Sequence, residues 1–197
     1  MRTPKLLLYP TDITPIPDLE ARLRSALSEL GLLGAPFELD GRRHFEAGDR
    51  FLELVSLVGC SPALELAPPD DPGARAEAAR LGRFCHLHLG PLFPIPVWRA
   101  GSRARPRCPH CRASAPAAQV LNAGGRCRAC GGQSAPETWR WRHQGARARL
   151  FLEIWGIHES EAAPTPGLTQ PIESITDTPW SYCFVDEAAQ AAEATSG

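Results

Sequence analysis

Long apolar runs are missing from this chain of 197 residues, although 43% of its residues are hydrophobic. None of them approaches the ~20 residues that a membrane-spanning helix requires. The apolar stretch at residues 6–9 ends at Pro10 and is too short for the core of a secretory signal. The length and the apolar content suffice for a folded core. We therefore expect a folded cytoplasmic protein with no membrane partner.

The local motifs of the common enzyme classes are also missing. The sequence contains no glycine-rich phosphate loop, no serine nucleophile elbow and no metalloprotease helix. A pocket near His86, His88 and His158 leaves an enzymatic alternative open, but no pattern points to it. The sequence favours a non-catalytic protein.

Two histidines and two isolated cysteines are candidates for further sites. His86 and His88 share one face of an expected strand, which is a spacing that can chelate a metal. Cys85 points to the opposite face, and no third ligand is evident nearby, so an ordinary strand pair is expected. Cys60 and Cys183 are expected to be buried structural thiols.

Acidic residues are nearly missing from one long segment, and basic residues are missing from the next. Residues 99–149 hold 11 arginines and one acid, Glu137, whereas residues 150–197 hold eight acids and no lysine or arginine. The formal net charge of -1 conceals this asymmetry. A basic centre predicts an anionic partner, or contact with the acidic end of the same chain. The single lysine of the chain reflects a general preference for arginine, which explains the residue type but not the clustering.

Hydrophobic periodicity predicts strands mixed with helices, without regular βαβ alternation. This pattern favours an α+β fold with a largely antiparallel sheet and two or three helices. Asp40-Gly41 predicts a tight hairpin. Helices are expected over residues 19–30, from 49 to about 58 and up to 81, and strands over residues 5–9, 84–89, 138–143, 147–154 and 180–185. The four prolines of residues 162–179 predict a loop.

The organisation follows from these elements. Residues 1–98 and 138–186 form the predicted body, residues 99–137 an insert, and residues 187–197 an acidic, flexible tail. Few large apolar residues lie in the insert, so a metal is expected to hold it together. A strand at 117–121 and a turn at 122–125 are expected inside it.

Four of the seven cysteines form two closely spaced pairs. Cys108 and Cys111 enclose Pro-His, Cys127 and Cys130 enclose Arg-Ala, and 15 residues separate the pairs. Four-thiolate zinc sites have this spacing. The odd number of cysteines and the missing secretion signal argue against a disulfide framework. A rubredoxin-like iron site is the alternative, although its pairs are usually further apart, and metal analysis distinguishes the two.

Residues of about 106–133 resemble the zinc-ribbon family. Cys-Pro-x-Cys at 108–111 and Cys-x-x-Cys-Gly at 127–131 look like its two knuckles. The resemblance implies Cys108, Cys111, Cys127 and Cys130 as ligands of a structural Zn²⁺, with Gly131 relaxing the second turn. Arg112 stands where the first knuckle often has glycine. A closed four-thiolate zinc offers no open coordination position, so it predicts scaffolding rather than catalysis.

Basic side chains around the knuckles are the predicted partner-binding residues: Arg103, Arg105, Arg107, Arg112, Arg126, Arg128, Arg140 and Arg142. Trp139 and Trp141 alternate with two of these arginines. The alternation suits stacking on single-stranded nucleic acid or, as an equal alternative, a core-facing tryptophan pair beside a solvated face. Nucleic acid is the partner we expect first. An acidic protein surface, bound by an adaptor or assembly factor, is the alternative.

Overall fold

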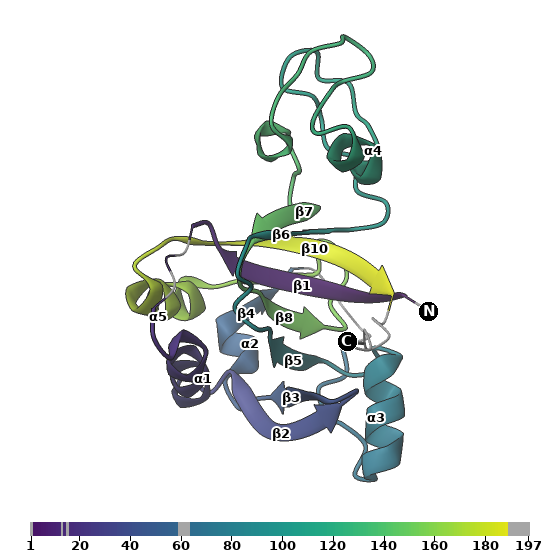
Figure 1. Cartoon of the computed structure of the whole chain (residues 1–197). Coiled ribbons are helices and arrows are strands. Elements are labelled where there is room, and N and C mark those ends of the chain that lie inside the picture. The colour runs from purple at the N-terminus through teal and green to yellow at the C-terminus, as the bar shows by residue number, and fades with distance from the viewer. Residues whose placement is uncertain (1, 13, 15, 59–63, 189–197) are drawn as a thin grey trace, which may run out of the picture.

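The computed structural model describes residues 2–12, 14, 16–58 and 64–188. Its body is built on six antiparallel strands in the order β10-β1-β8-β5-β3-β2 (Figure 1). The strands are β1 (Arg2–Pro10), β2 (Leu33–Leu39), β3 (Arg42–Ala47), β5 (His86–Leu89), β8 (Leu152–Trp155) and β10 (Trp180–Ala188). The predicted α+β class with a largely antiparallel sheet is confirmed.

Two further strand pairs lie outside this sheet. β4 (Val55–Leu57) pairs with β9 (Ala162–Pro164), and β6 (Val97–Ala100) pairs with β7 (Gly145–Ala148), both antiparallel. The helices are α1 (Leu19–Glu29), α2 (Phe51–Leu54), α3 (Pro72–Arg80), α4 (Ala117–Asn122) and α5 (Pro166–Thr176), with a 3₁₀ turn η1 (Pro136–Thr138). None of the helices in the described ranges is long and apolar enough to cross a membrane.

The main core lies between one face of the sheet and two helices. Leu6 and Ile154 from the sheet pack with Leu23 of α1 and Ile172 of α5, all of them fully buried. Leucines every fourth residue give α1 its buried face, as the periodicity predicts. Asp40 and Gly41 both have positive φ, 51° and 72°, which is the backbone of the tight hairpin predicted between β2 and β3.

Four predicted elements of the body are wrong. The strand expected over residues 147–154 is interrupted, and its two ends belong to β7 and β8 in different sheets. The second helix ends at Leu54 because the β-branched Val55 turns extended and starts β4. No strand forms over residues 138–143, where Arg142 and His143 have positive φ, and β7 pairs with β6 instead. The expected loop contains α5: Pro166 opens the helix, where its missing N–H is tolerated, and Leu168 and Ile172 bury its inner face.

The predictions for the two isolated cysteines and for the tail remain. Cys183 is fully buried, as expected. Cys60 and residues 189–197 of the predicted tail lie outside the described residues.

Candidate metal centre and its basic surface

Four sulfur atoms converge at the tip of the insert. Cys108 Sγ lies 3.9 Å from Cys130 Sγ, and Cys111 Sγ lies 3.7 Å from Cys127 Sγ. All four sulfurs lie within 4.8 Å of one another. A tetrahedron with Zn–S bonds of ~2.3 Å has sulfur–sulfur edges of about 3.8 Å. The donor set and its dimensions therefore fit a tetrahedral, thiolate-bound ion such as Zn²⁺.

The two knuckles are built alike. In the first, the Arg112 N–H donates to Cys108 O at 3.0 Å and the Cys108 N–H to Ala113 O at 2.9 Å. In the second, the Gly131 N–H donates to Cys127 O at 2.9 Å and the Cys127 N–H to Gly132 O, also at 2.9 Å. Arg112 and Gly131 both have left-handed backbones. The first knuckle thus forms the same turn although arginine replaces glycine.

Backbone N–H groups prepare the sulfurs for a cation. The N–H of Cys130, together with that of Ala129, lowers the pKa of the Cys127 thiol to about 7, against the opposing effect of desolvation. At Cys111 the N–H of Ala113 lowers the pKa, but desolvation and the neighbouring cysteine side chains outweigh it and raise the pKa to about 11. Thiols this close cannot all ionise by themselves, whereas a bound Zn²⁺ deprotonates all of them.

A small apolar cluster supports the cysteines from below. Trp139 and Trp141 are 3% and 8% exposed and pack with Val120, Cys108 and Cys127. The Trp139 indole donates to Gly125 O at 3.2 Å and the Trp141 indole to Pro136 O at 2.9 Å. Of the two alternatives for this tryptophan pair, the core-facing one is correct.

The backbone between the knuckles differs from the expectation. Residues 117–122 form the helix α4 and not a strand, and its inner side contributes Ala117 and Val120 to the cluster. Gly125 follows in a left-handed conformation, and a Cβ there would collide with Ser134 O. Glycine is therefore required where α4 turns into the second knuckle.

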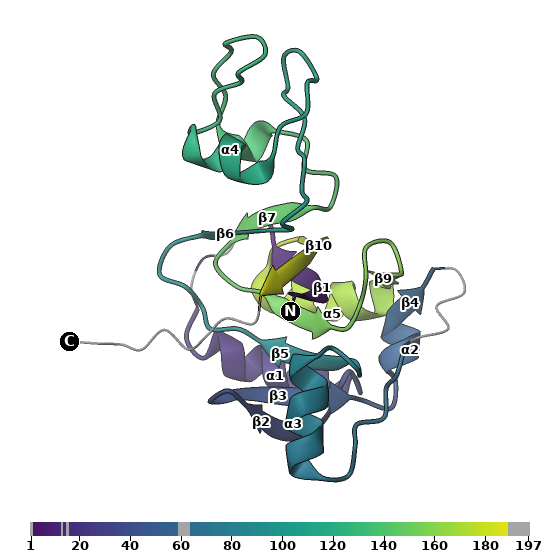
Figure 2. The same cartoon turned by 90° about the vertical axis from the view of Figure 1, so that its right-hand side faces the viewer.

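Two short segments around Ser102 and His143 form the neck between body and insert. This neck is attached to the edge strand β10 (Figure 2). On one side the Ser102 N–H and hydroxyl both donate to the Asp186 carboxylate at 2.6 Å. On the other side the His143 ring stacks on Tyr182 at 4.5 Å, and the Phe184 N–H donates to His143 O at 2.7 Å. One acidic side chain near the chain's C-terminal end thus contacts the neck of the basic segment.

The predicted partner-binding arginines extend from the knuckles to the base of the insert, where Arg103 and Arg142 line hollows shared with the body. Arg107 and Arg140 exchange two backbone hydrogen bonds, of 3.1 and 3.0 Å, which brings two positive side chains next to each other. Every one of the eight is exposed: Arg103, Arg105, Arg107, Arg112, Arg126, Arg128, Arg140 and Arg142.

A groove of about 420 Å³ runs between the insert and the body. Aromatic side chains line it, among them Trp98, Trp141 and Tyr182, together with Arg142 and Arg147. Sequence patterns do not predict this groove, because Trp98 and Tyr182 come from strands far apart in the chain.

The three histidines of the enzymatic alternative lie in two different places. His86 and His88 are buried beside His44, a residue that sequence patterns did not connect with them. His158 is exposed and lines a separate hollow with Arg103 and Asp186. Within the described ranges, the four cysteines are the only group of side chains with metal-ligand geometry.

Comparison of the chain with protein-family models, curated proteins and solved structures finds no match. The functional argument therefore rests on geometry and charge.

Proposed function

We propose that this protein is a non-catalytic zinc-ribbon protein whose basic insert binds single-stranded nucleic acid. The carrying observation is the pairing of an arginine-covered insert with an aromatic groove at its base. Arginines contact phosphates in a sequence-independent way, and aromatic side chains stack on bases.

The groove suits a single strand better than a duplex. Trp98 is half-buried and packs against Trp141 in a tilted arrangement, with ring centroids 4.8 Å apart, and Tyr182 stacks on His143. Arg142 and Arg147 stand beside these rings. Unpaired bases can enter such a groove while the phosphates follow the arginines, whereas paired bases stay stacked inside the duplex.

The metal's proposed role is structural. Zinc held by four cysteine thiolates has no open position for water or substrate, so the ion supplies folding free energy and not chemistry. Cys108, Cys111, Cys127 and Cys130 would hold it. This support extends to Arg107, which directly precedes Cys108, and to Arg140, which lies between Trp139 and Trp141 in the sequence.

An adaptor that binds an acidic protein surface is the second candidate. The same exposed arginines favour it, and the Asp186 contact at the neck is an example of such an acidic group within the chain. The aromatic groove favours nucleic acid over this alternative, because stacking adds to binding only when the partner offers flat rings.

The test is a titration of a labelled oligonucleotide of about 15 nucleotides with the zinc-loaded full chain, followed by fluorescence anisotropy. Affinity should fall at least tenfold between about 50 and 200 mM salt, since released counterions drive binding. A matched duplex should bind more weakly than the single strand. A flat salt dependence, or no binding at low salt, contradicts the proposal and leaves the adaptor as the candidate.

A further inference from the structure

The sheet buries ionisable side chains on the face opposite its main core. Strand register places His86 beside Trp155 and His88 beside Glu153, and Lys5 beside Trp155 on the other side. His44 of β3 stacks on His88 with ring centroids 4.7 Å apart. Each of the ionisable members of this set is at least nine-tenths buried: Lys5, His44, His86, His88 and Glu153.

Only some of the polar atoms of these groups form hydrogen bonds or ion pairs within the described part of the protein. Glu153 accepts from Lys5 Nζ at 3.1 Å and from Arg99 Nη1 at 3.0 Å. Among the described residues, no hydrogen-bond partner faces His44 Nδ1, His86 Nε2 or Trp155 Nε1. Buried polar groups without partners are costly, so a space beside them is expected to hold a polar guest such as water.

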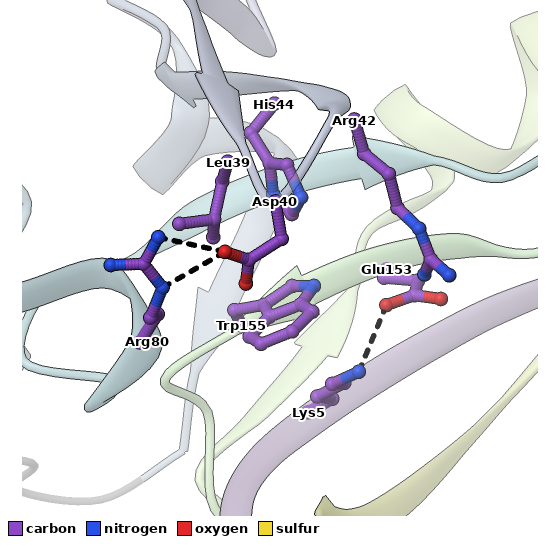
Figure 3. A pocket seen from close by; sticks show the side chains of 8 residues that line it. All are labelled: Lys5, Leu39, Asp40, Arg42, His44, Arg80, Glu153 and Trp155. Atoms are coloured by element: carbon purple, nitrogen blue, oxygen red, sulfur yellow. Dashed lines mark hydrogen bonds and ion pairs between the residues drawn. The ribbon is translucent and has the colours of Figure 1, made fainter. Parts of the chain in front are cut away.

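Two of these unpartnered groups line a small chamber shown in Figure 3. Its volume is about 20 Å³, and His44, Trp155, Lys5 and Glu153 form its walls. The imidazole of His44 and the indole of Trp155 meet edge to face at 5.5 Å, with Lys5 and Glu153 beside them (Figure 3). The chamber has the size of one water molecule.

A larger groove lies on the other side of Arg42 and Glu153, which line both spaces. Its volume is about 640 Å³, within the usual range for small-molecule sites. Four arginines line it, Arg24, Arg42, Arg43 and Arg99, against two carboxylates. Both carboxylates are engaged: Glu153 as above, and Glu20 by the Leu92 N–H at 2.7 Å.

The groove also has flat apolar walls. Phe93 and Trp98 are half-buried there, and the Arg99 guanidinium lies 5.5 Å from the Phe151 ring centroid. His88 lines the same groove, and its Nδ1 lies 2.9 Å from Arg43 O. A proton on Nδ1 makes this a hydrogen bond and leaves Nε2 as an acceptor for a ligand hydroxyl or amine.

We infer that this groove in the body binds a small phosphate monoester that carries a planar ring, of the size of a mononucleotide. Guanidinium groups bind a doubly charged phosphate through paired, charge-assisted hydrogen bonds. Arg24 and Arg43 are the groove arginines that we assign to this contact, whereas Arg99 is already paired with Glu153. The aromatic walls accept the ring. Trp98 is the one described residue that lines both this groove and the groove at the base of the insert, and the arginines of the two sites differ.

The probe is AMP, titrated calorimetrically into the zinc-loaded full chain, with adenosine and inorganic phosphate as separate arms. AMP should bind at least about tenfold more tightly than either, because each lacks one half of the recognised chemistry. The double substitution Arg24→Gln/Arg43→Gln should weaken AMP binding about tenfold or more. The matched control is Arg22→Gln, an exposed arginine of α1 outside the groove lining, and it should leave AMP binding unchanged.

Four outcomes overturn the inference. Two concern AMP itself: no AMP binding at millimolar concentration, or unchanged binding by a double variant that unfolds at the wild-type temperature. The other two concern its halves: adenosine, or inorganic phosphate, that binds as tightly as AMP. The Arg107→Gln/Arg140→Gln variant separates this site from the insert, since it should weaken oligonucleotide binding and keep AMP binding.

Discussion

Arg112 and Gly131 occupy equivalent positions in the two knuckles and share a left-handed backbone, with φ of 63° and 72°. Glycine adopts this conformation without cost, whereas arginine loses about 1 kcal/mol or more to steric contact of its Cβ. The first knuckle therefore keeps a strained residue whose exposed side chain adds a positive charge beside the metal centre.

Replacing Arg112 by glycine should separate stability from binding. Arg112→Gly relieves the backbone strain, so the apparent zinc affinity, measured by competition with a chelator, should rise about fivefold, equivalent to about 1 kcal/mol. The slope of log affinity against log salt for single-stranded nucleic acid should fall by about 0.7. Arg128→Gln is the matched control: it removes a charge from the second knuckle and should not raise zinc affinity. A lower zinc affinity of Arg112→Gly would refute the strain argument.

Arg107 and Arg140 lie opposite each other in a hydrogen-bonded backbone pair of the insert. Because like charges opposite each other on neighbouring strands repel, Arg107→Gln/Arg140→Gln should keep or slightly raise the unfolding temperature. The same variant should lower the salt slope of oligonucleotide binding by about 1.4, at about 0.7 per charge. Arg22→Gln serves as the control for charge loss on the body. An unchanged slope would place the nucleic acid elsewhere.

Chelation should unfold the insert and spare the body. Trp139 and Trp141 pack directly on Cys108 and Cys127, so metal removal exposes their indoles and shifts tryptophan emission to longer wavelength. The β-sheet signal in circular dichroism should persist, because the main core shares no residue with this cluster. Cys111→Ser/Cys130→Ser should show the shifted emission before chelator is added. Loss of the β-sheet signal on chelation would mean that the body depends on the metal.

The buried histidines should make the body acid-sensitive. Burial, followed by the neighbouring histidine charges, lowers the pKa of His44 to about 2. Burial lowers the pKa of His86 to about 4 against a backbone hydrogen bond to Phe84 O. Below the ordinary value of 6.5 the unfolded chain binds more protons than the folded one. The free energy of unfolding should therefore be constant above about pH 6.5 and fall by about 1.4 kcal/mol per pH unit for each histidine down to about pH 4.

Urea titrations between pH 8 and pH 4 measure this dependence. The Cys111→Ser/Cys130→Ser background removes metal release as a second pH-dependent process. His86→Phe places an aromatic ring beside Phe37 and Phe84 and should remove about half of the slope. A free energy of unfolding that stays constant from pH 6.5 to pH 4 would show that His44 and His86 are protonated in the folded body.

Sequence reasoning succeeded where a feature is local. The Asp40-Gly41 hairpin and each Cys-x-x-Cys turn involve residues within a few positions of one another, and leucine spacing alone defines α1. Helix α5 was not predicted because it contains Pro166 and Pro171, and proline usually argues against a helix. Pro166 is compatible with α5 because it is the first residue of the helix. Trp139 and Trp141 pack into the apolar cluster beside the cysteines and form no strand, and this outcome depends on tertiary packing.

Features that depend on strand order could not be predicted. His44 meets His86 and His88 because β3 pairs with β5, and Glu153 joins them because β8 pairs with β5 on its other side. Trp98 of β6 packs against Trp141, which lies outside the strands and far from Trp98 in the sequence. Sequence spacing carries no information about such meetings.

The zinc content of the purified full-length protein tests the central claim most directly. Elemental analysis of wild type beside Cys111→Ser/Cys130→Ser, which removes one ligand from each knuckle, should find one zinc per chain in the first and none in the second. Iron in place of zinc, or equal metal content in both proteins, would contradict a structural zinc centre formed by the two knuckles.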